Sequence, residues 1–187
     1  MRTRILAAAG VAALLVLASC GRPATPDESP SPAAPAFSHS LSSDLSGYYL
    51  PASEVRVGKW SLDHVFVGQA AEFQSWEAGG RSENFAPFML QFDDTSSPMI
   101  ADKFGGSVAY TVSARVLPTA YSVTDTAISF EGRSPELGAV SFEGALDPGA
   151  LATSRRNLGN EGVVVTGALK VGDAPARNVQ LRWWAGD

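Results

Sequence analysis

The sequence is poor in the residues that carry metal and redox chemistry, and these shortages exclude several classes of protein. Cys20 is the only cysteine among 187 residues, so the chain can form no internal disulfide. With no other thiolate, no His-x-x-x-His pair and no Asp-rich loop of calcium spacing, we expect neither a metal site nor any other cofactor. Stability must then come from a packed core, which a domain of about 140 residues is large enough to bury.

Catalytic motifs are equally scarce. His39 and His64 are the only histidines, and no Gly-x-Ser-x-Gly elbow supplies a nucleophile. Asp63 precedes His64, but neighbours on a strand point to opposite faces, so we do not expect Asp63 to orient the imidazole. Glu131 and Glu143 occupy matching positions of a predicted hairpin and could form a glycosidase pair. A hydrolase that uses His64 or these carboxylates is therefore one alternative, while we expect no enzymatic activity.

The first residues follow the plan of an export signal. Residues 1–4 are short and basic, and residues 5–17 are apolar but shorter than the roughly 20 residues of a membrane span. Leu17-Ala18-Ser19-Cys20 resembles the bacterial lipobox, in which a peptidase cuts before a diacylated cysteine. The resemblance implies a lipoprotein with residues 1–19 as signal peptide and Cys20 as the lipidated N-terminus. An ordinary secreted protein with an incidental Cys20 is the alternative.

This resemblance implies a place in the cell envelope. Gly21 is similar to the non-Asp second residue that directs Gram-negative lipoproteins to the outer membrane, where the domain would face the periplasm. The membrane would then be a partner through the acyl chains on Cys20, each buried CH₂ contributing roughly 0.8 kcal/mol. Loss of Arg2 and Arg4 lowers Lys+Arg from 14 to 12 against 19 Asp+Glu, which leaves a net charge of −7. Nucleic acid is bound through cationic patches and is not an expected partner.

Proline and small residues indicate a tether between Cys20 and the folded domain. Its prolines are Pro23, Pro26, Pro30, Pro32 and Pro35. Such a composition buries too little apolar surface to order itself, so we expect residues 20–44 to be disordered. His39 is interpreted as a solvated residue of this tether. A single domain is expected to follow, from residue 45 to residue 187.

Alternation of apolar and polar residues predicts that this domain is all-β. Residues 107–117 alternate as one half-buried strand, and residues 163–171 and 178–184 alternate in the same way. Residues 128–132 and 140–144 are near-copies around a loop with Pro and Gly, which is typical of a hairpin. We therefore expect an antiparallel β-barrel, with a β-sandwich as the alternative.

Helix signals are confined to two short segments. Asp147 can cap a helix, Pro148 suits its first position and Gly159 can end it, which predicts one short helix near 148–158. Residues 70–78 could hold one or two further helical turns. Both segments are too short to change the fold class.

Aromatic residues are the remaining sign of function. They are crowded into the first half of the domain, and Trp183 and Trp184 are consecutive on a predicted strand near the end. One of the two must face outward, and Trp184 is our candidate for a partner surface. The expected function is non-enzymatic binding of a small amphiphile or lipid. The alternative is a protein-interaction or structural module of the envelope.

The second half of the domain resembles the YceI-like family of lipocalin-like β-barrels, which bind isoprenoid lipids in the bacterial envelope. The similar segments are Tyr121-Ser122-Val123, Ile128-Ser129-Phe130, residues 138–148 and residues 165–172. They cover about a third of the chain. The resemblance implies a barrel with an interior lipid pocket, and we carry over no binding residue from it.

Overall fold

A computed structural model describes residues 36–101, 108–159 and 161–186. The predicted signal peptide, Cys20 and most of the predicted tether lie outside the described residues. The strands are β1 (Phe37–Ser40), β2 (Gly47–Pro51), β3 (Arg56–Val57), β4 (Trp60–Val67), β5 (Phe88–Asp94), β6 (Met99–Ala101), β7 (Val108–Tyr110), β8 (Ser113–Val116), β9 (Pro118–Thr124), β10 (Ala127–Ser134), β11 (Gly138–Leu146), β12 (Val163–Val171) and β13 (Arg177–Trp184). The helices are α1 (Ala70–Glu77) and α2 (Pro148–Arg156).

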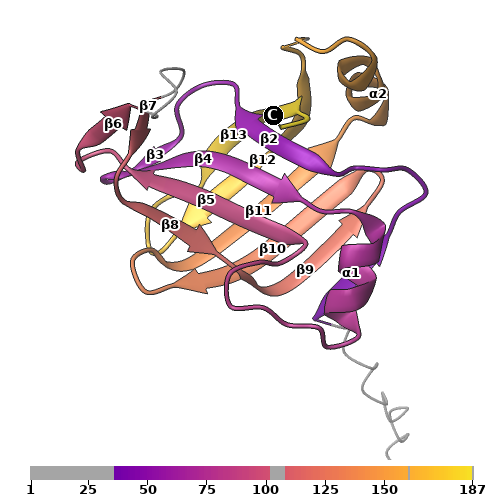
Figure 1. Cartoon of the computed structure of the whole chain (residues 1–187), viewed down its shortest axis with the longest axis horizontal. Helices are drawn as coiled ribbons and strands as arrows, with labels where there is room; N and C mark the ends of the chain where they lie inside the picture. The colour runs from indigo at the N-terminus through magenta and orange to yellow at the C-terminus, as the bar shows by residue number, and fades with distance from the viewer. Residues whose placement is uncertain (1–35, 102–107, 160, 187) are drawn as a thin grey trace, which may run out of the picture. The chain divides into compact units, whose positions relative to one another are not determined.

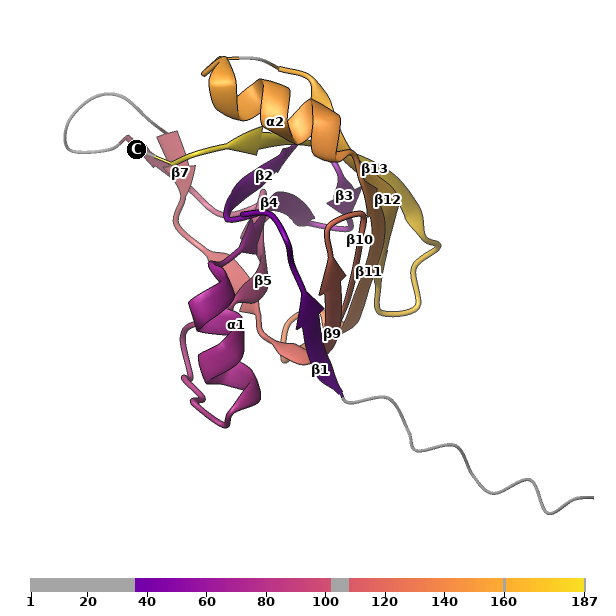
Figure 2. The same cartoon turned by 90° about the vertical axis from the view of Figure 1, so that its right-hand side faces the viewer.

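The prediction of an all-β domain is confirmed. One sheet with the order β1-β9-β10-β11-β12-β13-β2-β4-β5-β8 curls into a half-barrel (Figures 1 and 2). Its ladders are antiparallel except for β1, which pairs in parallel with β9. The last strand, β13, pairs with β2. This ladder joins the strands β9 to β13 to the strands β2, β4 and β5 in one sheet.

The predicted helix near 148–158 is confirmed as α2. The Asp147 side chain accepts hydrogen bonds from the backbone N–H groups of Gly149 and Ala150 at 2.8 and 3.0 Å, and Pro148 takes the first helical position. Helix α2 lies against β12 and β13. The segment 70–78 forms α1, a second helix, which contacts the edge strand β1 (Figure 1).

The ordered domain begins earlier than residue 45, which corrects the predicted extent of the tether. Phe37 lies opposite Tyr121 in the β1–β9 ladder. The prediction of His39 as a solvated residue is also wrong, because its ring stacks on Phe73 at 5.3 Å and its Nδ1 lies 2.9 Å from Oε1 of Glu77. Local composition does not predict this strand, because β1 is ordered by pairing with the free edge of β9, which is distant in sequence.

The predicted single strand 107–117 is also corrected. It divides into β7, which pairs only with β6 in a separate two-stranded sheet, and β8, which pairs with β5. Val112 lies between them with 46% of its surface exposed. The alternation continues through this break, but the pairing partner changes, and alternation carries no information about the partner.

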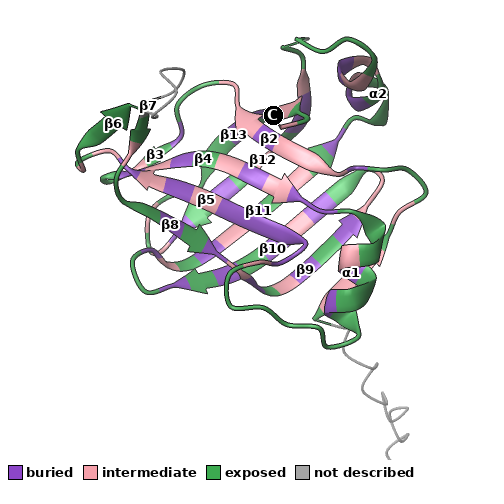
Figure 3. Cartoon of the chain, in the orientation of Figure 1, coloured by how far each residue is buried: buried purple, intermediate pink, exposed green. Residues whose placement is uncertain are grey.

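Inward-facing side chains fill the interior of the half-barrel. Buried and exposed residues alternate along the strands (Figure 3). Phe88, Phe130 and Phe142 are fully buried, and Phe88 contacts Phe130 with ring centroids 5.2 Å apart. Helix α1 adds the fully buried Phe73, whose ring meets Tyr121 of β9 at 5.3 Å. The aromatic residues of the first half are therefore largely core, as aromatic residues usually are.

A buried carboxylate closes the end of β5, and it makes the stability of the fold depend on pH. Asp94 accepts hydrogen bonds from Lys59 Nζ at 2.7 Å and from the backbone N–H of Ser96 at 2.9 Å. The hydrogen bonds from Lys59 and from the Ser96 hydroxyl lower the pKa of Asp94 from its ordinary 3.8 to about 2. Because the folded pKa is depressed, this stabilisation is complete above pH 3.8 and is lost as the pH falls towards 2.

We expect Asp94→Asn to remove this pH dependence. The variant should be less stable than the wild type at neutral pH, because an amide cannot form the ion pair with Lys59. The difference between the two proteins should shrink as the pH falls below about 4. Urea unfolding followed by tryptophan fluorescence at a series of pH values measures it. A difference in stability between the two proteins that stays constant down to a pH of about 2 would contradict the assignment of the pH dependence to Asp94.

Candidate functional site

A row of apolar side chains crosses the outer face of β13, β2, β4 and β5. In the register of the sheet Trp184 lies opposite Tyr48, Tyr48 opposite Phe66, and Phe66 opposite Met89. The ring centroids of Trp184 and Tyr48 are 5.6 Å apart, and those of Tyr48 and Phe66 are 5.4 Å apart. Strand neighbours such as Tyr49 are fully buried on the inner face. We call these four side chains the apolar row.

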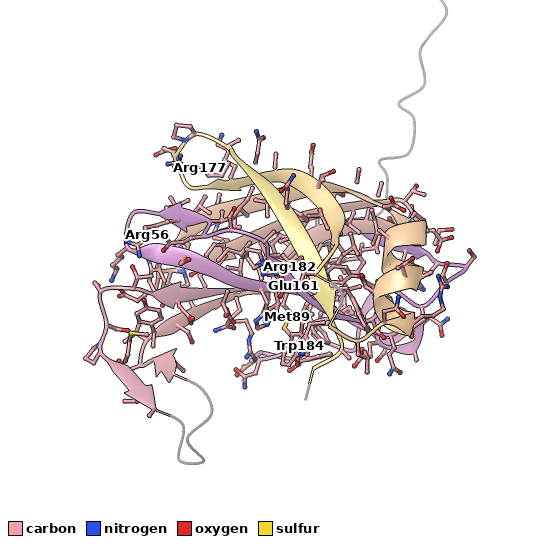
Figure 4. The ribbon with its side chains drawn as sticks, turned by 90° about the horizontal axis from the view of Figure 1, so that it is seen from above. Arg56, Met89, Glu161, Arg177, Arg182 and Trp184 are labelled. Atoms are coloured by element: carbon pink, nitrogen blue, oxygen red, sulfur yellow. The ribbon has the colours of Figure 1, made fainter. Side chains whose placement is uncertain are left out.

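The apolar row is most open at its Trp184 end. Trp184 exposes 41% of its surface, Tyr48 and Phe66 are half-buried, and Met89 is buried. Phe85, in the connection from α1 to β5, packs on Phe66 at 5.7 Å and covers the other end. Figure 4 shows β13 running from Arg177 to Trp184, with Met89 labelled near the Trp184 end.

The two consecutive tryptophans point to opposite sides, as expected from the sequence. The indole N–H of Trp183 donates to the backbone carbonyl of Ser46 at 3.0 Å, and the Arg155 guanidinium lies 5.0 Å from the Trp183 ring. Trp183 is thus held by α2 and the start of β2. Among the described rings, Trp184 contacts only that of Tyr48, its neighbour in the apolar row. The candidate chosen from the sequence is the outward one.

A polar hollow of about 380 Å³ lies beside the apolar row. Asp63, Asp93 and Arg182 line it, together with Tyr110 of β7. Burial raises the pKa of Asp93, and the nearby negative charge of Asp63 raises it further, while His64 opposes both effects. Arg182 is partly neutralised by Glu161, whose Oε2 lies 3.0 Å from its Nη1 (Figure 4).

The expectation that Asp63 would not orient His64 is wrong. Leu62 lies opposite Phe92, but His64 lies opposite Gln91, so Asp63 is an extra residue in a β-bulge. The bulge breaks the alternation, and Oδ2 of Asp63 lies 2.7 Å from Nδ1 of His64. The imidazole also meets the Tyr48 ring edge-on at 5.0 Å. Among the described residues no hydroxyl is hydrogen-bonded to His64, whose side-chain partner is Asp63.

The two glutamates of the predicted hairpin also lie on the outer face of the sheet, but on strands away from the apolar row. The hairpin itself is confirmed as β10 and β11, but Glu131 lies opposite Ser141 and Glu143 opposite Ser129. The carboxylates are therefore diagonal neighbours rather than a directly opposed pair. Both are exposed, and both line a hollow that also includes Ser129 and Ser141.

Two other kinds of site are absent from the part of the chain that the structure describes. No cluster of three or more His, Cys, Asp or Glu side chains is placed to hold a metal ion. None of the described helices has the length and hydropathy needed to cross a membrane. The apolar row and its adjoining hollow remain the most distinctive surface of the described residues.

No family model, no curated protein and no solved structure matches the chain. The similarity of residues 121–184 to YceI-like barrels therefore stays a prediction from the sequence.

Proposed function

We propose that this chain is a non-enzymatic binding protein of the bacterial envelope, anchored by a lipidated Cys20, that recognises a protein partner through the apolar row. The observation that carries the proposal is the alignment of Trp184, Tyr48 and Phe66 across three neighbouring strands on the outer face. Aromatic side chains are enriched at the centres of protein interfaces and contribute much of their binding energy. A partner would bury the open Trp184 end.

The filled interior favours this surface over an interior lipid pocket. The fully buried Phe73, Phe88, Phe130 and Phe142 occupy the space in which a lipocalin-like barrel would hold its ligand. A pocket for a drug-sized or lipid ligand requires a volume of roughly 300 Å³ or more that side chains leave empty. The hollows found among the described residues are open and are lined by side chains of the outer face, loops or helix ends. An amphiphile is thus the less favoured ligand.

The partner surface can be tested by site-specific crosslinking in the native host. A photoreactive phenylalanine analogue at position 184 should give a discrete crosslinked protein band, because the side chain lies on the proposed contact. The same analogue at Ala168, exposed on the outer face of β12, is the matched control and should give none. Tyr48→Ser should weaken the crosslink formed from position 184, because it removes the ring that neighbours this position in the apolar row. Equal crosslinking from positions 184 and 168 would argue against the proposal.

Lipidation is expected at Cys20, which lies outside the described residues. Cells grown with labelled palmitate should incorporate the label into the wild-type chain, and the intact mass should correspond to an acylated protein that starts at Cys20. Cys20→Ser should abolish the label and leave residues 1–19 attached, because the lipobox peptidase cuts before an acylated cysteine. A Cys20→Ser protein with the same membrane-bound mature form as the wild type would contradict the lipoprotein assignment.

A further inference from the structure

Apolar groups border the polar hollow on two sides. On one side lies the apolar row, whose Tyr48 ring contacts His64 next to Asp63. On the other side the small sheet of β6 and β7 pairs Met99 with Tyr110, and Tyr110 lines the hollow. Met99 exposes 56% of its surface. A ligand that fills this face would meet apolar contacts, then carboxylates, then apolar contacts again.

The charges around the hollow leave an excess of negative charge at its centre. Glu54 is paired with Arg56 at 2.8 Å, and Arg182 is paired with Glu161 at 3.0 Å. Asp63 is shared only with His64, and within the described ranges Asp93 has no ion pair. Two carboxylates therefore line one hollow, and only Asp63 is paired with an imidazole.

The surroundings of the half-buried Asp93 disfavour the ionised form of its carboxyl group. Burial raises its pKa, and the charge of Asp63 acts in the same direction. A cation inserted between Asp63 and Asp93 would oppose this rise in pKa, because an opposite charge nearby favours the ionised carboxylate. The hollow is thus complementary to a Lys or Arg side chain.

We infer that the protein partner presents a basic segment whose Lys or Arg side chain enters the hollow between Asp63 and Asp93, flanked by apolar residues that cover the apolar row and the Met99–Tyr110 pair. This inference rests on the proposed function of the apolar row and adds the chemistry of the partner. The net charge of −7 that remains without residues 1–19 acts in the same direction, because an acidic protein attracts a basic partner and accelerates its association at low salt.

Short labelled peptides can test this chemistry without knowledge of the natural partner. Three peptides are compared, in which Phe alternates with Lys, with Glu or with Ser, and their binding to the detergent-extracted full chain is followed by fluorescence anisotropy against empty micelles. The Lys peptide should bind about tenfold more tightly than the Glu peptide at low salt, as expected for two partly desolvated charges. Added salt should reduce this preference.

Paired carboxylate variants locate the effect. Asp63→Asn/Asp93→Asn should reduce the preference for Lys over Glu to less than about threefold. Glu131→Gln/Glu143→Gln removes the same net charge from a remote outer face and should leave the preference unchanged. Loss of the preference in both double variants would overturn the inference, because the attraction would then follow net charge alone.

The same measurements separate failure of this inference from failure of the proposed function. If all three peptides bind equally and Trp184→Ser weakens each of them, the apolar row is a binding surface and only the basic chemistry is refuted. If Trp184→Ser changes none of the affinities, the apolar row does not bind and both proposals are refuted. A Lys preference that depends on Asp63, Asp93 and Trp184 together supports both.

Discussion

Gly167→Val is expected to lower the free energy of unfolding by about 3 kcal/mol or more, which is a large part of the 5–15 kcal/mol of a typical domain. Gly167 of β12 lies opposite Gly144 of β11, on the inner face of the sheet. A Cβ atom at this position would lie 2.3 Å from the backbone oxygen of Glu143 and 3.0 Å from the Phe142 ring. Backbone and core would both have to move, because the ring of Phe142 occupies the space that the two glycines leave.

Urea unfolding monitored by circular dichroism measures this effect. Ala168→Val is the matched control, since Ala168 is the next residue on the same strand and faces solvent; it should change stability by less than about 0.5 kcal/mol. If Gly167→Val does not fold, Gly167→Ala adds only the Cβ and should still be destabilised by more than the control. Equal stabilities of Gly167→Ala and Ala168→Val would show that the close packing of Phe142 over the glycines is unimportant.

Phe73→Ala is expected to cost about 3–5 kcal/mol, because it opens a cavity between α1 and the half-barrel. Phe73 is fully buried and contacts both the His39 ring of β1 and the Tyr121 ring of β9. Its loss should therefore destabilise the whole domain and also loosen β1. Urea unfolding measures the first effect, and proteolysis near residues 37–40 measures the second.

Gln74→Ala is the control for this prediction, since Gln74 is exposed on the same helix and should change stability by less than about 0.5 kcal/mol. A loss of under about 1 kcal/mol for Phe73→Ala would mean that the site collapses around the missing ring. Unchanged protection of residues 37–40 would show that β1 is held by its ladder with β9 alone. Either result would assign α1 a smaller role in filling the interior.

The candidate site was only partly predictable from the sequence. Trp184 could be chosen because consecutive residues of a strand face opposite ways, and this local rule held. The same rule failed for Asp63 and His64, because a bulge turned both side chains to one side. Bulges arise from how two strands pair, so a strand taken alone carries little sign of them.

The sequence by itself determined the features that depend on neighbouring residues. Alternation placed β12 and β13, the near-repeat placed the β10–β11 hairpin, and Asp147 with Pro148 placed α2. Tertiary structure alone decided the partners of the strands. It ordered β1 on the free edge of β9, divided residues 107–117 between two sheets and brought Trp184 beside Tyr48, which is far away in sequence. The physical reason is that propensity and capping act over a few residues, whereas register is set by which distant strand supplies the hydrogen bonds.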